Sequence, residues 1–371
     1  MDRSERSETG GKPAVWVFAK YLHPAGDWRG VRWSDDGHSC VERRGGGLTI
    51  DVGLSPPRHG LMITSQSADP IDVAADLSWD LDASGLEWTE GGASVRVFAI
   101  DMVEIPGRGY DVRAADGAVS PLRSSDGSNL RIMSEGPLGV GDAAGLTYES
   151  SDFGGDQRGP IPEAFPKGVG TFYVMRNELT EGEYGEFLST LAGRARLSRD
   201  ITAHPGYIES GGSIVVRRDS VEIGSPERPA GFVSWADGIA WASWAGLRPM
   251  SELEFEKIVS DADAFGVRSM RGGRWERVVT LGSEEGRAFR GSEGSGFLDD
   301  LGQPYVFANW DWPGPRAVGS GFRGGFGEGI LTTPGDRTYA AYEATYGNEH
   351  EGFRAVRDGP VEAAAPNLSA E

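Results

Sequence analysis

Side chains that could bind a redox metal or act as nucleophiles are few and scattered in this sequence. Cys40 is its only cysteine, so neither an intrachain disulfide nor a cluster of thiolate ligands can form. The five histidines are His23, His38, His59, His204 and His350. No two of them stand three or four residues apart, the spacing that a metal site on a helix requires. We therefore interpret each histidine as a surface or hydrogen-bonding residue, and metal-binding residues stay unassigned.

Carboxylates gather in one glycine-rich segment and form the best candidate for a cation site. The residues are Glu284, Glu285, Glu293, Asp299 and Asp300. Calcium prefers oxygen ligands of this kind, but the spacing is not that of an EF-hand. In a chain with a formal net charge of −20, a solvated acidic loop is the simpler interpretation. We expect no cofactor, and a structural calcium ion is the open alternative.

Residues suited to binding without chemistry lie near the C-terminus. They are Trp310, Trp312, Arg337, Tyr342, Tyr346, Asn348 and Glu349. Aromatic, amide and arginine side chains are enriched in adaptable binding surfaces, and irregular segments commonly carry function. We predict that these residues bind a ligand. The alternative is that several of the aromatic side chains are core and that Arg337 is structural.

Three helix starts are marked by capping boxes, in which a hydroxyl and an acid three residues later satisfy free N–H groups. They begin at Thr180, Ser234 and Ser251. Gly246 and Pro249 must end the second helix and redirect the chain into the third. After Thr180, an apolar stripe predicts a buried helix face, formed by Tyr184, Phe187, Leu188 and Leu191.

The first quarter of the chain has the alternation and turn residues of short strands. The predicted strands are 15–22, 30–34, 48–54, 60–65 and 72–79. They predict a small antiparallel β-sandwich over residues 13–97, with a disordered leader at 1–12 and a disordered tail at 358–371.

The segment Arg228–Lys257 resembles the formylglycine-generating enzymes, also called sulfatase-modifying factors. Their hallmark is Ser-Trp-x-(Asp/Glu)-Ala followed by Trp-x-Gly-Leu-Arg-Pro-(Met/Thr)-Glu-x-Glu-(Phe/Trp)-Glu. Further segments are similar to family landmarks in the same order: Met102–Gly107, Thr171–Leu191, Arg323–Phe326 and Gly352–Arg357. The resemblance implies a loop-rich α+β domain of C-type-lectin-like scaffold over residues 98–357, preceded by the β-sandwich.

The family's chemistry needs residues that this sequence lacks. Its members oxidise a substrate cysteine with copper held by a cysteine pair between the Arg-Gly-Gly and Gly-Phe-Arg strands. The corresponding segment, Gly325–Glu351, contains no cysteine. The ergothioneine-type sulfoxide synthases of the same superfamily bind iron through histidines on an added helical bundle, which is not predicted here. Formylglycine generation is therefore not expected.

The function that we predict is non-catalytic binding of a ligand or a protein. An unrecognised iron- or copper-dependent oxidase or sulfoxide synthase of the superfamily is the alternative, and a hypervariable display protein on the same scaffold is a second one. The strong negative charge disfavours nucleic acid and favours a neutral or cationic partner, such as a glycan or a basic peptide. No apolar run predicts membrane insertion, and no signal peptide is evident. The default expectation is a cytoplasmic protein, or an exported one if a signal has been removed.

Overall fold

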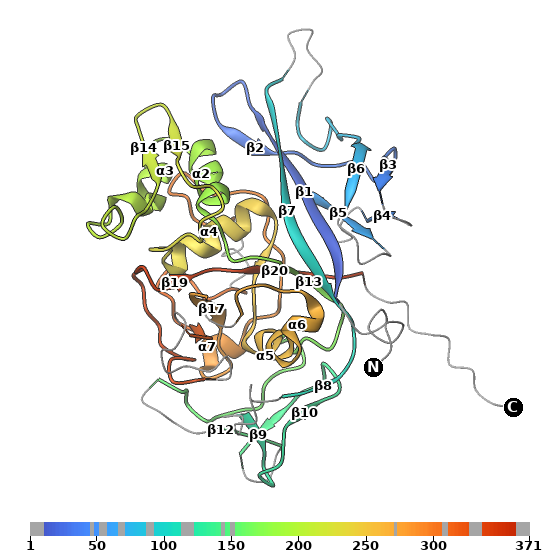
Figure 1. Cartoon of the computed structure of the whole chain (residues 1–371), viewed down its shortest axis with the longest axis vertical. Helices are drawn as coiled ribbons and strands as arrows, with labels where there is room; N and C mark the ends of the chain where they lie inside the picture. Colours follow the sequence, from blue (N-terminus) through green and yellow to red (C-terminus); the bar gives the residue numbers. More distant parts are fainter. Residues whose placement is uncertain are drawn as a thin grey trace, which may run out of the picture.

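The computed structural model describes residues 11–44, 48–51, 58–65, 71–86, 93–112, 122–141, 145–148, 153–270, 273–305, 311–325 and 336–360. The fold is mixed α+β and rich in strands, with one long curled sheet, several short sheets and many loops (Figure 1). The predicted α+β class is confirmed. Among the described residues, no helix has the length and apolar character needed to span a membrane.

The strands of the N-terminal half are β1 (Lys12–Leu22), β2 (Trp28–Gly30), β3 (Ser39–Arg44), β4 (Leu48–Asp51), β5 (Gly60–Ser65), β6 (Asp72–Asp76), β7 (Val95–Ile105), β8 (Tyr110–Asp111), β9 (Leu122–Ser124), β10 (Arg131–Ile132), β11 (Gly139–Val140), β12 (Gly145–Tyr148) and β13 (Phe172–Met175). The later elements are α2 (Glu181–Thr190), α3 (Gly193–Arg199), η2 (Ile201–Ala203), β14 (Ile214–Val216), β15 (Val221–Ile223), α4 (Trp235–Ala245), β16 (Arg248–Pro249), α5 (Glu252–Ser260), α6 (Ala262–Phe265), β17 (Trp275–Val279), α7 (Glu284–Arg287), β18 (Ser320–Arg323), β19 (Glu351–Gly352) and β20 (Ala355–Asp358).

The long sheet joins the two predicted domains. Its order is β16-β20-β13-β7-β1-β5-β4, with β2 paired to β1. Strand β7 pairs antiparallel with β1 over residues 95–104, and it pairs with β13 near its end. The predicted boundary between Val97 and Phe98 therefore falls inside β7, and the correct description is a sheet that continues across it. Whether the first unit folds alone remains a prediction.

The predicted ends also need correction. Strand β1 already begins at Lys12, within the predicted leader, and β20 runs to Asp358, the first residue of the predicted tail. Residues 1–10 of the predicted leader and 361–371 of the predicted tail lie outside the described residues.

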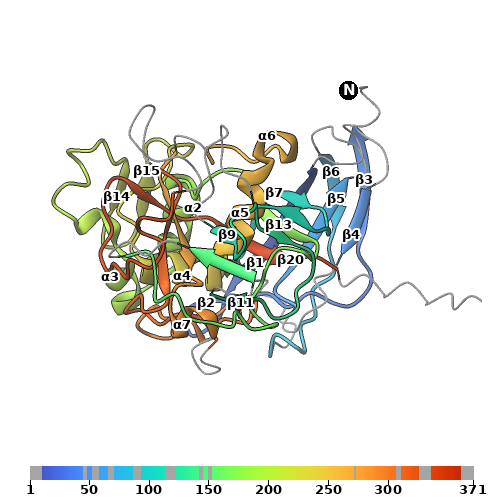
Figure 2. The ribbon, with the colours of Figure 1, turned by 90° about the horizontal axis from the view of Figure 1, so that it is seen from below.

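Strand β1 is buried on both faces, because its side chains alternate between two cores. Trp16 and Phe18 belong to the largest hydrophobic cluster, which includes the helices. Val17 and Tyr21 belong to a second cluster, over which the β3–β6 sheet and neighbouring residues pack. Figure 2 shows β3 and β6 on the side of the sheet away from α2 and α4. The N-terminal strands thus lie in two layers, and one face of β1 is shared with the rest of the molecule.

All three predicted capping boxes are present. Helices α2, α4 and α5 begin one residue after Thr180, Ser234 and Ser251, and each hydroxyl accepts the N–H three residues ahead. Gly246 ends α4 with a φ of +72°, a left-handed conformation that glycine adopts without strain. The starts of these three helices were therefore readable from the sequence.

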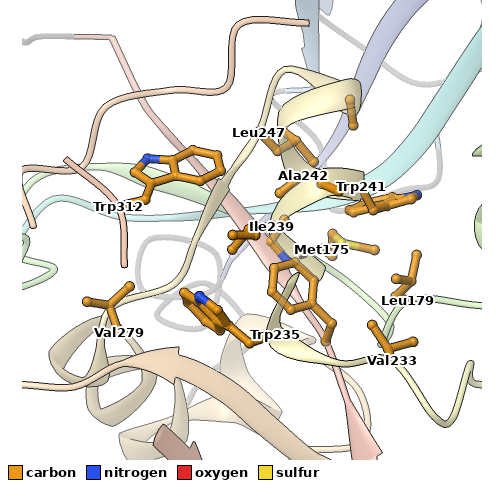
Figure 3. Close-up of a cluster of buried hydrophobic side chains, with 14 of the residues drawn as sticks. Met175, Leu179, Val233, Trp235, Ile239, Trp241, Ala242, Leu247, Val279 and Trp312 are labelled. Carbon is orange, nitrogen blue, oxygen red and sulfur yellow. Dashed lines mark hydrogen bonds between the residues drawn. The ribbon is translucent and has the colours of Figure 1, made fainter. Parts of the chain in front are cut away.

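The main core surrounds α4, which is buried on nearly all sides. Figure 3 shows Trp235, Ile239 and Trp241 of this helix among side chains from distant segments, including Met175 and Trp312. The predicted stripe of α2 is confirmed, because Tyr184, Phe187, Leu188 and Leu191 are all buried.

Side chains from the long sheet satisfy the carbonyl groups at the C-terminal end of α4. Lys20 Nζ donates to the Trp244 carbonyl at 2.7 Å, and Trp16 Nε1 donates to that of Ala245 at 2.7 Å. Arg357 Nη1, from β20, donates to the Gly246 carbonyl at 2.8 Å. The last carbonyls of a helix have no partner within the helix and carry negative partial charge. The two cations and the indole therefore attach α4 to β1 and β20.

Candidate functional site

Aromatic side chains from two distant segments meet at the surface near the C-terminus. Tyr346 is 51% exposed, and its hydroxyl lies 3.1 Å from that of the half-buried Tyr342. The Tyr342 ring centroid is 4.6 Å from that of Phe153, which is 40% exposed, and 5.8 Å from that of Tyr339. We call Phe153, Tyr339, Tyr342 and Tyr346 the tyrosine face. Two of these four residues were predicted as site residues.

The tyrosine face rests on the half-buried Trp275 and on the buried Phe322 and Arg277. Trp275 packs against Tyr339 with ring centroids 5.1 Å apart, and Phe322 packs beneath Tyr342 at 6.2 Å. The Arg277 guanidinium lies 4.5 Å from the Phe322 ring centroid and donates to the carbonyl of Tyr346 at 2.5 Å. Such a base holds the rings in place, so little ordering is required when a ligand binds.

Asn348 and Glu349 shape the edge of this surface. The Asn348 side chain donates to Glu351 at 2.9 Å and accepts the backbone N–H of His350 at 2.8 Å, so it holds the loop. Glu349 is exposed and accepts a hydrogen bond from Ser210 at 2.5 Å. Of the two, only Glu349 offers a carboxylate to a ligand.

Arg337 and Trp312 lie in the interior. Arg337 is 4% exposed, and its Nε donates to Glu252 at 2.5 Å. The same carboxylate pairs with Arg323 at 2.9 Å, which makes a buried ion network. Trp312 is also 4% exposed and donates to the Ser292 carbonyl at 2.7 Å. The predicted Trp310 lies outside the described residues.

The five acidic residues considered for a calcium site lie in different surroundings. Glu284 and Glu285 begin α7, while Glu293 is buried with Arg248 and Arg357 within 4 Å. Asp299 and Asp300 are exposed. Over the described parts of the chain, no group of three or more histidine, cysteine or acidic side chains could hold a metal ion. Structural calcium remains a prediction.

Two features of the surface were not foreseen from the sequence. Phe153 lies in a segment rich in glycine and aspartate, where nothing local marks it as a partner of Tyr342. A cleft of about 910 Å³ lies elsewhere, beside Lys20 and Trp244. Its walls come from segments hundreds of residues apart, so no local spacing could reveal it.

Comparison with protein-family models gives no match, and neither does comparison with curated proteins. The resemblance to the formylglycine-generating enzymes therefore stays a proposal, carried by the sequence landmarks.

Proposed function

We propose that this chain is a non-catalytic binding protein built on a scaffold of the sulfatase-modifying-factor type, and that the tyrosine face is its binding surface. The observation that carries the proposal is the meeting of Phe153 with Tyr342 and Tyr346 on this largely buried base. Large aromatic side chains held at a surface are the usual anchors of binding sites, because they supply apolar contact area at a low cost in entropy.

The composition of the surface favours a neutral glycan as the ligand. Aromatic rings offer flat apolar area, and the paired hydroxyls of Tyr342 and Tyr346 can both donate and accept hydrogen bonds. Exposed carboxylates of Glu343 and Glu349 flank these tyrosines in the sequence, so an anionic ligand is disfavoured. A basic peptide is the second class of ligand compatible with these groups.

The scaffold assignment rests on the landmarks from Met102 to Arg357. The capped helices α4 and α5 and the α+β class are compatible with it. Copper chemistry of the family's kind is not part of the proposal, because the segment Gly325–Glu351 lacks the cysteine pair.

The proposal is tested by probing a glycan array and a basic-peptide array with the full chain. Binding of the double variant Phe153→Ala, Tyr346→Ala to any ligand found should fall at least tenfold, with little change in the thermal midpoint. Met133→Ala is the matched control, because Met133 is a large apolar side chain of similar exposure (57%) outside the tyrosine face and outside the cleft. Binding that survives the double variant, or that is lost equally in Met133→Ala, would move the site elsewhere.

A further inference from the structure

A second candidate site is the cleft of about 910 Å³ between the β1–β2 hairpin, residues 190–195 and the loop 295–305. Figure 1 shows β2 at the same end of the molecule as α2 and α3. Its volume lies in the range of sites that enclose a small organic molecule, which is roughly 300–1,000 Å³. Trp28, Trp244, Phe297 and Tyr305 contribute aromatic walls. The cleft can therefore cover most of the apolar part of such a ligand.

The charges in the cleft differ from those of the whole chain. The chain has 56 acidic against 36 basic residues, yet the cleft is lined by Lys20, Arg29, Arg32 and Arg194 against three aspartates. Arg29 is paired with Asp27 at 2.7 Å. In the described part of the chain, neither Arg32 nor Arg194 forms an ion pair with a carboxylate. Two guanidinium groups thus remain available to an anion.

Contacts with the wall of the cleft hold Arg32 where it can bind an anion. Its guanidinium carbon lies 6.0 Å from the ring centroid of Phe297, so charge and aromatic surface are adjacent. Its backbone is fixed by hydrogen bonds to Asp80 and to the Ser84 hydroxyl. A guanidinium group forms strong, directional hydrogen bonds with carboxylate, sulfonate and phosphate oxygens.

The bottom of the cleft is formed by the buried Lys20, beside the point where the Gly296 backbone packs closely against His59. Lys20 is 2% exposed, and Nζ donates to the Trp244 and Gly296 carbonyls, both at 2.7 Å. Burial lowers the pKa of Lys20 to about 7, whereas the two carbonyl acceptors favour its charged form. An ammonium group has three donors, so one remains beyond these two carbonyls.

Gly296 allows the bottom of the cleft to form. Its φ is +73°, and a Cβ there would lie 2.6 Å from Cγ of the buried His59. His59 packs edge-on against Phe297, with centroids 4.9 Å apart, and thereby supports the aromatic wall from behind. Burial, with the neighbouring charge of Lys20, holds the pKa of His59 well below its usual value, so the imidazole is neutral near pH 7.

We propose that this cleft binds a small organic anion, with an aromatic or apolar body against Trp28 and Phe297 and an acidic head at Arg32 and Arg194. The site is separate from the tyrosine face and does not depend on the function proposed for it. Its ligand is an anion, whereas the tyrosine face favours a neutral glycan and disfavours an anion, so the two sites make distinguishable predictions.

Two fluorescent probes of similar shape test the charge preference on the full chain: anilinonaphthalene sulfonate, which is anionic, and phenylnaphthylamine, which is neutral. We expect saturable binding of the sulfonate. The double variant Arg32→Gln, Arg194→Gln should raise the Kd of the sulfonate about tenfold or more and change that of the neutral probe less than about twofold. Phe297→Ala should weaken both probes, because it removes shared apolar wall.

Arg217→Gln is the matched control, since Arg217 is an exposed arginine on the β14–β15 hairpin and is already paired with Glu222. It should leave both Kd values unchanged, as should Tyr346→Ala. The proposal is overturned if the sulfonate does not bind saturably, or if the arginine variant keeps the parent affinity for it. Equal losses of both probes in that variant, or equal losses in Arg217→Gln, would also contradict it. Thermal midpoints confirm that each variant is folded.

Discussion

Glu178 shows how a single buried carboxyl can make the stability of this protein depend on pH. Burial, followed by repulsion from Glu276, raises its pKa from 4.5 to about 7, and the nearby Arg354 only partly opposes this. The native state therefore holds more protons than the unfolded state between these two values. Raising the pH across this window lowers the free energy of unfolding. Glu293, whose pKa burial also raises to about 7, acts in the same direction.

We predict that the free energy of unfolding falls between pH 5 and pH 8 by about 1–3 kcal/mol for each of these two carboxyls. In Glu178→Gln, urea denaturation over this range should show a fall that is smaller than the parent's by about 1–3 kcal/mol. Glu222→Gln is the control, because Glu222 is an exposed carboxylate on a hairpin. A pH dependence in Glu178→Gln as steep as in the parent would show that Glu178 does not titrate in this window.

The buried stripe of α2 gives a second prediction at this scale. Phe187 is 0% exposed and packs edge-on against Trp244, with ring centroids 5.4 Å apart. Phe187→Ala should reduce the free energy of unfolding by about 3–5 kcal/mol, the usual effect of truncating a buried aromatic. Leu197→Ala, at a site 76% exposed, should change it by less than about 0.5 kcal/mol. A loss below 1 kcal/mol for Phe187→Ala, measured by chemical denaturation, would be inconsistent with this packing.

Individual residues were predictable from the sequence where a local pattern fixed their surroundings. The stripe from Tyr184 to Leu191 is an example, since helical spacing alone places these side chains on one face. The tyrosine face was only partly foreseen, because Phe153 joins it through a contact with Tyr342 across a large sequence separation. The interior position of Arg337 depends on Glu252, which is also far away in the sequence, at a separation of 85 residues.

Among the elements, the start of α4 was evident in the sequence, but the way in which its end is held was not. Ser234 and Asp237 form a local capping box. The carbonyl groups at the other end are satisfied by Trp16 and Lys20 from the first strand and by Arg357 from the last. Strand β3 was also missed, because SCVERR has little of the apolar alternation by which a half-buried strand is recognised.

The hydrogen bond from Trp16 to the Ala245 carbonyl tests how the end of α4 is held. Trp16→Phe keeps an aromatic side chain but leaves a buried helix carbonyl without its donor, which should cost about 1–3 kcal/mol beyond the loss of volume. Trp33→Phe is the matched control, since Trp33 is buried and its Nε1 has no partner among the described residues. Chemical denaturation should show the larger loss for Trp16→Phe, and equal losses would contradict a stabilising role for this bond.

For the molecule as a whole, the sequence predicted two domains. In the structure, one long sheet contains strands from both of them. Turn residues and alternation indicated β1, β4, β5 and β6, but β3 was missed and the strand predicted at 30–34 is β2 at Trp28–Gly30. Composition could not show that β7 continues through the predicted boundary at Val97. Pairing of β7 with both β1 and β13 is a tertiary property. Local patterns in the sequence therefore indicate strands, but not which distant strands pair.

This continuity predicts how an isolated fragment should behave. A fragment of residues 13–97 retains only Val95–Val97 of β7 and loses the partners of Trp16 and Phe18 in the main core. We expect it to be unfolded by circular dichroism, while the full chain unfolds in one transition. A folded, β-type spectrum from the fragment would contradict this and would show that residues 13–97 fold on their own as a β-sandwich.

The central claim is that this chain binds a ligand without the oxidation chemistry of the family that it resembles. The most direct measurement is mass spectrometry of a Cys-x-Pro-x-Arg peptide incubated with the full chain, copper and oxygen. The account predicts that the peptide thiol remains at the level of the enzyme-free control, because no cysteine pair is available between Gly325 and Glu351. Conversion of the thiol to an aldehyde, with more than one turnover per chain, would contradict it.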